Sequence, residues 1–157
     1  MKILSGTLDH CVLQRGGPVD VTGKTDATTG TVSAVLAKKG RRLAQATSRI
    51  RDRQFALKFT NLPPGGPYTV TFTVGAERLV VKDVLVGDVW ICAGQSNMQG
   101  LGYLRHAEPP HPKVRGFYMD DHWAVAKDPL HTYGNCVDEV HGLLSGGKTW
   151  PRPLEGV

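Results

Sequence analysis

The sequence has little of what a disulfide-stabilised, metal-binding or membrane-spanning protein needs. Its three cysteines, Cys11, Cys92 and Cys136, are odd in number and widely spaced, and none forms a CxxC pair. We therefore expect neither a disulfide framework nor a zinc site. The six histidines lack a close metal-binding spacing such as His-x-x-x-His, so no metal or other cofactor is expected.

Long apolar runs are also missing. No run approaches the roughly 20 residues that span a bilayer, so no membrane partner is expected. Residues Met1 to Gly6 contain one basic residue and only two consecutive apolar side chains, whereas a secretory signal needs an apolar region of about 7–15 residues. As written, the chain is expected to be cytoplasmic, or its true N-terminus has been lost.

Positive charge is concentrated in the first half of the chain. Residues 1–84 hold 13 Lys/Arg against 6 Asp/Glu, whereas residues 85–157 hold 6 against 8. Seven basic residues fall between Lys38 and Arg53, without the interleaved aromatic residues of a surface that binds single-stranded nucleic acid. We expect these residues at the edge of a sheet, where Lys and Arg prevent pairing with other chains. Nucleic acid is not an expected partner.

Residues 1–84 have the pattern of short β-strands separated by turns. The clearest strand is Tyr68–Val74, in which Tyr68, Val70, Phe72 and Val74 share the face predicted to enter the core. Regular strand spacing predicts an all-β immunoglobulin-like sandwich, although the Cys…Trp…Cys signature of antibody domains is absent. The other expected strands are Lys2–Leu13, Pro18–Gly23, Thr31–Ala37, Gln54–Phe59 and Arg78–Leu85.

The pattern changes near Val89. Val89–Ala93 is an unbroken apolar run, typical of a strand that is buried on both faces in a parallel sheet covered by helices. We therefore predict two domains, a β-sandwich at 1–84 and the beginning of an α/β domain at 85–157. A further strand is expected at Val114–Met119.

The apolar run ends in Gly94-Gln95-Ser96, which suits a serine nucleophile at the carboxyl end of a strand. A glycine two residues earlier permits a sharp turn. A helix starting just afterwards would favour the negative charge of acyl transfer. The G-x-S-x-G pattern of α/β hydrolases does not match, because position 98 is Met. Alternatively, Ser96 caps a helix and has no catalytic role.

The stretch Gly87-Asp88-Val89-Trp90-Ile91-Cys92-Ala93-Gly94-Gln95-Ser96-Asn97-Met98, here named the nucleophile block, resembles that of the sialate O-acetylesterase group of SGNH hydrolases. Residues 114–119 and 123–131 are similar to later segments of the same group. The resemblance implies a flavodoxin-like α/β domain with a parallel sheet. It also implies that Ser96 is the nucleophile, with its own backbone N–H as an oxyanion donor. Gln95 and Asn97 would order the turn or contact the substrate, an acetylated carbohydrate. Trp90 is expected in the core.

In this family the remaining oxyanion donors, a glycine and an asparagine, lie on later loops, and an Asp-x-x-His pair lies near the end of the catalytic domain. Only 71 residues run from Gly87 to Val157, so we expect an incomplete domain with little activity. Two nearer spacings, Asp128-x-x-His131 and Asp138-x-x-His141, end 35 and 45 residues after Ser96. Either spacing could place a carboxylate against an imidazole and be the catalytic pair. We expect them instead in a loop near the substrate mouth, or as plain structure.

The sequence thus predicts a serine esterase that removes O-acetyl groups from sugars through an acetyl-enzyme. It does not specify the sugar. The alternative is a non-catalytic β-sandwich, a binding or assembly module followed by a remnant hydrolase segment.

Overall fold

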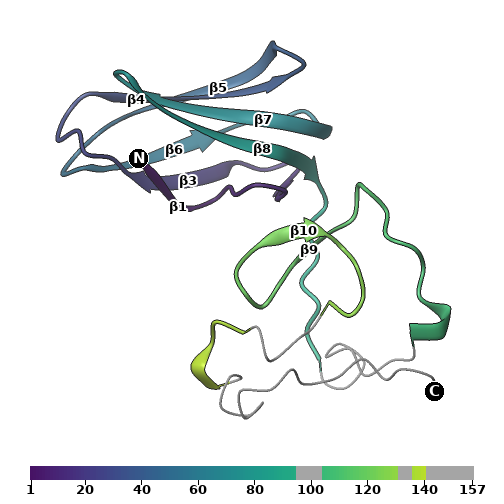
Figure 1. Ribbon diagram of the computed structural model, residues 1–157. Helices are drawn as coiled ribbons and strands as arrows, with labels where there is room; N and C mark the ends of the chain where they lie inside the picture. Colours follow the sequence, from purple (N-terminus) through teal and green to yellow (C-terminus); the bar gives the residue numbers. More distant parts are fainter. Residues whose placement is uncertain (95–103, 131–135, 141–157) are drawn as a thin grey trace. The chain divides into compact units, whose positions relative to one another are not determined.

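The computed structural model describes residues 1–94, 104–130 and 136–140. The chain divides into two compact units, Met1–Val89 and Trp90–Val157. The first unit is a β-sandwich whose two sheets form separate layers in Figure 1.

The smaller layer is a three-stranded antiparallel sheet with the order β1-β3-β6. Its strands are β1 (Lys2–Ser5), β3 (Val19–Lys24) and β6 (Gln54–Phe59). The larger layer has five strands with the order β2-β8-β7-β4-β5. Its strands are β2 (Val12–Gln14), β4 (Thr31–Lys38), β5 (Arg41–Arg49), β7 (Gly65–Val74) and β8 (Glu77–Gly87). All pairs in this layer are antiparallel except β2 with β8, which is parallel.

Alternating apolar residues from both sheets fill the space between the layers. The prediction for β7 is confirmed, because Tyr68, Val70, Phe72 and Val74 are each at most 8% exposed. Tyr68 also donates its hydroxyl hydrogen to backbone oxygens at the preceding corner, 3.0 Å from that of Pro63 and 3.2 Å from that of Pro64. The facing sheet contributes the buried side chains of Val19, Val21, Phe55, Leu57 and Phe59.

The predicted single strand over Lys2–Leu13 is wrong, because the chain changes sheets within it. β1 pairs with β3 in one layer, whereas β2 pairs with β8 in the other. Gly6, between the two strands, has a φ of +93°, and a Cβ at this position would lie 2.1 Å from the backbone oxygen of Asp20. Only glycine fits so close to the neighbouring strand with this backbone conformation.

Three of the seven clustered basic residues lie at a sheet edge, as the sequence predicted. β5 is the last strand of the five-stranded order, and Arg41, Arg42 and Arg49 on it are exposed. The sequence analysis did not identify β5 as a strand, and it assigned Gly65 and Gly66 to a loop although they begin β7. The other predicted strands of the sandwich agree with β3, β4, β6 and β8 to within two residues.

The described part of the second unit has little regular secondary structure. It contains a 3₁₀ turn, η1 (Leu104–His106), and an antiparallel hairpin of β9 (Arg115–Phe117) and β10 (Trp123–Val125). β9 falls within the strand predicted at Val114–Met119. Within residues 90–94, 104–130 and 136–140 there is no parallel sheet, so the expected α/β layer is not seen there.

The predicted strand Val89–Ala93 is wrong. These residues have no strand structure, and Val89, Trp90 and Ile91 are 41%, 83% and 92% exposed. Trp90 is therefore not a core residue in this structure. A parallel strand exists only through hydrogen bonds to a neighbour. The described strands after Gly87 pair only with each other. The consecutive apolar run that is buried throughout lies just earlier, at Val84, Leu85 and Val86 in β8.

Replacing Phe72 tests the core. Phe72 is fully buried, so Phe72→Ala is expected to lower the free energy of unfolding by about 3–5 kcal/mol. Chemical denaturation followed by circular dichroism measures this change. Thr73, the next residue on β7, is exposed, and Thr73→Ala should change stability by no more than about 0.5 kcal/mol. Equal effects of the two substitutions would contradict the predicted register of β7.

Candidate active site

The nucleophile block starts where β8 ends. Val84, Leu85 and Val86 are buried, and Gly87 is the last residue of the strand. β2 runs parallel beside this end, with Val12 opposite Leu85, Leu13 opposite Val86 and Gln14 opposite Gly87. The first residue of the block is therefore part of the sandwich's larger sheet.

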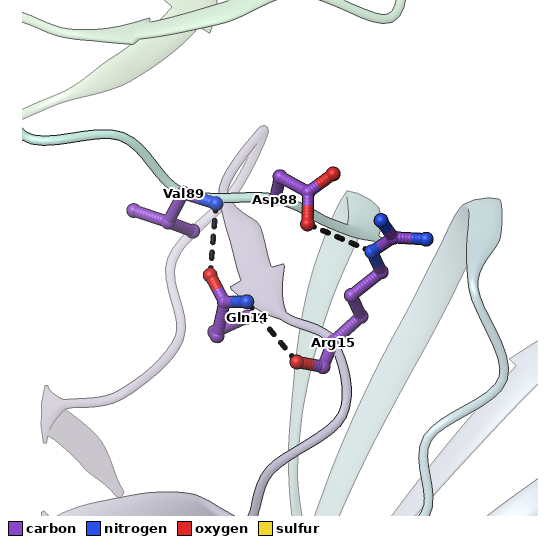
Figure 2. Close-up of polar contacts among 4 residues, drawn as sticks. All are labelled: Gln14, Arg15, Asp88 and Val89. Atoms are coloured by element: carbon purple, nitrogen blue, oxygen red, sulfur yellow. Dashed lines mark hydrogen bonds and ion pairs between the residues drawn. The ribbon is translucent and has the colours of Figure 1, made fainter.

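Two side chains at the end of β2 extend this pairing into the block. The Gln14 side chain accepts a hydrogen bond from the Val89 backbone N–H, with Oε1 at 2.9 Å, and donates through Nε2 to the Arg15 backbone oxygen at 3.1 Å. The Arg15 backbone N–H donates to the Gly87 oxygen at 2.8 Å. The Arg15 Nε donates to Oδ1 of Asp88 at 2.7 Å. Figure 2 shows these side chains converging on residues 88 and 89. We name Gln14 and Arg15, with their contacts to residues 87–89, the β2 clamp.

The β2 clamp is polar and accessible to solvent. The side chains of Arg15 and Asp88 are 54% and 47% exposed. An ion pair this exposed typically adds only about 0.2–1 kcal/mol to stability. The ion pair between Arg15 and Asp88 therefore contributes little to holding the sandwich together.

An open hollow of about 600 Å³ lies beside the β2 clamp, within the first unit. Its polar lining comes from Gln14, Arg15, Asn61 and Asp88, and its apolar lining from Leu62, Pro63 and Pro64. Carboxylate, guanidinium and amide groups can exchange hydrogen bonds with hydroxyl groups. The hollow thus combines an apolar surface with groups that can bind a polyol.

The residues predicted to carry the chemistry, Gln95, Ser96 and Asn97, lie outside the described residues. The structure therefore gives the start of the nucleophile block, from Gly87 to Gly94, and not the nucleophile itself. Sequence reasoning missed Gln14 and Arg15. Their contacts join positions 73–75 residues apart, and no local pattern marks such a pair.

The two Asp-x-x-His spacings are only half described. Asp128 is exposed and lines a second hollow of about 230 Å³ in the second unit, together with His111 and Lys127. Asp138 is exposed, and its backbone N–H donates to the Cys136 sulfur at 3.3 Å. Their partners in the motif, His131 and His141, lie outside the described residues, so neither pairing is tested.

The β9–β10 hairpin is ordered by Tyr118, just past β9. Its hydroxyl accepts a hydrogen bond from the Lys127 backbone N–H at 3.0 Å. That hydroxyl also lies within hydrogen-bonding distance of the Val125 and Lys127 backbone oxygens. The Tyr118 ring stacks on His122, whose Nδ1 lies 2.6 Å from the carboxylate of Asp120. These contacts join the end of β9 to the segment that follows β10, and Asp128 in that segment is exposed.

Within 1–94, 104–130 and 136–140, no three His, Cys, Asp or Glu side chains lie close enough to hold a metal ion. No helix in these ranges has the length and apolar character to cross a bilayer.

Comparison with known proteins finds similarity in the second half of the chain. Residues 86–147 match the family described as "Carbohydrate esterase, sialic acid-specific acetylesterase". The matched region begins with the last residues of β8 and contains Gln95, Ser96 and Asn97. Residues 86–147 are therefore similar to a segment of that carbohydrate esterase family.

Individual relatives narrow the class. The chain is 37% identical over 79 residues to sialate O-acetylesterase of Pongo abelii, covering 46% of this chain and 15% of that protein. It is 52% identical over 42 residues to the Homo sapiens enzyme and 55% identical over 42 residues to the Mus musculus enzyme, each match covering 24% of this chain and 8% of the relative. The predicted resemblance to the sialate O-acetylesterase group is confirmed for this segment. The chain matches only 8–15% of the length of these relatives.

A solved structure of a carbohydrate acetylesterase from Xanthomonas citri is also similar. It is 32% identical with a TM-score of 0.49, and the match covers 59% of this chain and 20% of that one.

The three thiols should differ in reactivity. Cys11 is buried and lies 3.5 Å from the Thr7 hydroxyl, whereas Cys92 is exposed. Burial raises the pKa of the Cys11 thiol, outweighing the hydrogen bond from Thr7. Because thiolate is the reactive form, Cys92 is expected to react with a disulfide reagent in the folded protein and Cys11 only after unfolding. Timed labelling with mass spectrometry measures the order, and rapid labelling of Cys11 in the folded chain would contradict it.

The same shift makes stability depend on pH. A raised pKa in the folded state means that folded Cys11 holds its proton to higher pH than unfolded Cys11 does. Its contribution is complete below the ordinary thiol pKa of about 8.5 and is lost as pH rises above that value. Melting curves of the wild type and Cys11→Ala, measured between pH 7 and 10, should converge as pH rises. Parallel curves would contradict this assignment.

Proposed function

We propose that this chain carries the nucleophile segment of a carbohydrate O-acetylesterase, a serine hydrolase that acts through an acetyl-enzyme. One observation carries the proposal: the twelve-residue nucleophile block lies within the 62-residue stretch, 86–147, that matches the carbohydrate esterase family. The substrate is an acetylated carbohydrate, by analogy with the named activities of the relatives.

In the proposed reaction the Ser96 oxygen attacks the carbonyl carbon of the acetyl ester while a base removes its proton. The tetrahedral oxyanion is stabilised by hydrogen-bond donors, among them the Ser96 backbone N–H. Collapse breaks the bond between the acetyl carbon and the sugar oxygen, which takes the proton from the base and leaves as a hydroxyl, so that acetyl-Ser96 remains. Water then attacks the acetyl group, releasing acetate and restoring the serine hydroxyl. Gln95 and Asn97 flank the nucleophile and would order its turn or contact the substrate.

We further propose that the base and the remaining oxyanion donors come from sequence beyond these 157 residues. The chain matches only 8–15% of its curated relatives, and Asp128, the described carboxylate of the first near spacing, is exposed to solvent. A serine hydroxyl without a base is a weak nucleophile. Each missing oxyanion donor costs roughly 10²–10³ in rate.

The domain arrangement belongs to the same proposal. Residues 1–84 form an immunoglobulin-like sandwich, supported by the N-terminal segment shared between both sheets and by the hydrogen bonds from the Tyr68 hydroxyl to a preceding corner. Residues 85–157 are the first part of an SGNH-type α/β domain, supported by the family match.

Esterase assays test this proposal. The 157-residue chain is expected to hydrolyse p-nitrophenyl acetate no faster than its Ser96→Ala variant. A chain extended through a complete catalytic domain is expected to turn over repeatedly and to lose at least about 10³-fold in kcat with Ser96→Ala. Ser48→Ala, on β5 of the sandwich, is the matched control and should change neither rate.

Two outcomes would contradict it. If the short chain turned over many times and Ser96→Ala abolished the reaction, the base would have to lie within these residues. His131→Ala and His141→Ala would then identify it. If Ser96→Ala left the extended enzyme fully active, Ser96 would not be the nucleophile.

A second candidate function is carbohydrate binding by the sandwich without catalysis. The hollow lined by Arg15, Asn61, Asp88 and the segment Leu62–Pro64 favours it. Sugar hydroxyls could bind the polar groups while a sugar's C–H face packs on the prolines. Such a site would function whether or not a catalytic domain is present.

Titration with an acetylated xylo-oligosaccharide, followed by NMR, tests the binding function. Amide shifts are expected to change at residues 14–16 and 61–64 of the wild type and to weaken in Asn61→Gly. Glycine removes the amide side chain yet tolerates the positive φ of 54° at this position. Lys58→Ala, on β6 of the other sheet, is the control. Absence of shifts in the wild type, or unchanged shifts in Asn61→Gly, would exclude the hollow as a sugar site.

A further inference from the structure

The contacts of the β2 clamp all end on the first three residues of the nucleophile block. The Arg15 backbone N–H binds Gly87, its guanidinium binds Asp88, and the Gln14 side chain binds the Val89 N–H. The regular ladder between β2 and β8 stops at the Gln14–Gly87 pair. Side chains thus continue the pairing for two residues beyond the last pair of strand residues.

These contacts are poorly suited to stabilising the fold. Leu13 supplies the buried apolar side chain of β2, whereas Gln14 is exposed and Arg15 is half exposed. Solvent screens an ion pair of this kind. Two hydrogen bonds and an ion pair on three successive residues nevertheless remove most of the backbone freedom at that point. Without them, the chain could leave β8 in many directions.

We infer that Gln14 and Arg15 are positioning residues, which fix the direction in which the nucleophile block leaves the sandwich. Ser96 follows Val89 by seven residues. The role as a guide for the nucleophile rests on the proposed function. The β2 clamp itself is independent of that function, because it is defined by the contacts of Gln14 and Arg15 with residues 87–89.

The ion pair and the neutral hydrogen bond should respond differently to salt. High ionic strength weakens the attraction between Arg15 and Asp88. The bond from the Val89 N–H to Gln14 is carried by an uncharged amide and is less sensitive. Each half of the clamp can therefore be loosened separately, by salt in one case and by substitution in the other.

A spin label on Cys92 measures the clamp in the intact 157-residue chain. Cys92 is exposed and lies three residues after Val89, whereas Cys11 is buried. Cys136→Ser leaves Cys92 as the single accessible thiol. Gln14→Met removes the hydrogen-bond acceptor at similar volume, and Arg15→Met removes the charge. Each is expected to shorten the rotational correlation time of the label at least twofold.

Further variants separate positioning from stability. Asp88→Asn should match Arg15→Met, and the double variant should add nothing, because both remove one ion pair. Arg15→Lys keeps the charge and should retain most of the restriction. Val21→Ala lowers stability from the other sheet, where Val21 is fully buried, and Lys58→Ala removes the exposed pair with Asp20. Neither should change the label while the protein remains folded by circular dichroism.

Hydrogen exchange at the Val89 amide gives an independent measurement. Protection is expected in the wild type and should be lost in Gln14→Met. An unprotected Val89 amide in the wild type would overturn the inference. So would a Cys92 label that is as mobile in the wild type as in Gln14→Met and Arg15→Met. Neither readout uses esterase activity, so a failure of the proposed function would leave these results intact, and a failure of the clamp would leave the Ser96 assay intact.

Discussion

Parallel pairing between β2 and the end of β8 joins two segments of the first unit that are far apart in sequence. Val12, Leu13 and Gln14 lie opposite Leu85, Val86 and Gly87, so the first strand to enter the larger sheet also holds its last residues. β8 pairs with β7 on its other side. The sandwich is thereby complete at the residue where the nucleophile block begins.

Side chains are buried just before Gly87 and exposed after it. Val84, Leu85 and Val86 are buried and supply the apolar contact that holds β8 in the sheet. From Asp88 onward the described side chains are exposed as far as Gly94. Before Gly87, β8 is held by buried apolar side chains. After Gly87, the backbone is held by hydrogen bonds. Hydrogen bonds depend on orientation, whereas the hydrophobic effect does not.

The apolar run Val89–Ile91 shows why a pattern of consecutive apolar residues is ambiguous. Such a run can be a strand buried on both faces, but only when neighbours supply hydrogen bonds and cover. Val84–Val86 has neighbours on both sides, β7 and β2, and is buried. Val89–Ile91 is similar in composition, but it has no paired strand among the described residues and is exposed. Local sequence did not distinguish the two.

The sequence by itself determined β3, β4, β6 and β8 of the sandwich, the inward face of β7 and the resemblance of the nucleophile block. Each of these features depends on period-two alternation or on consecutive residues, so each can be recognised from residues that are close together in the sequence. Tertiary structure alone decided that residues 2–14 divide between two sheets. It also decided that β5 forms the basic edge, and that Gln14 and Arg15 hold Asp88 and Val89. These features depend on contacts between residues far apart in sequence, which form only when the two sheets pack and which no local pattern records.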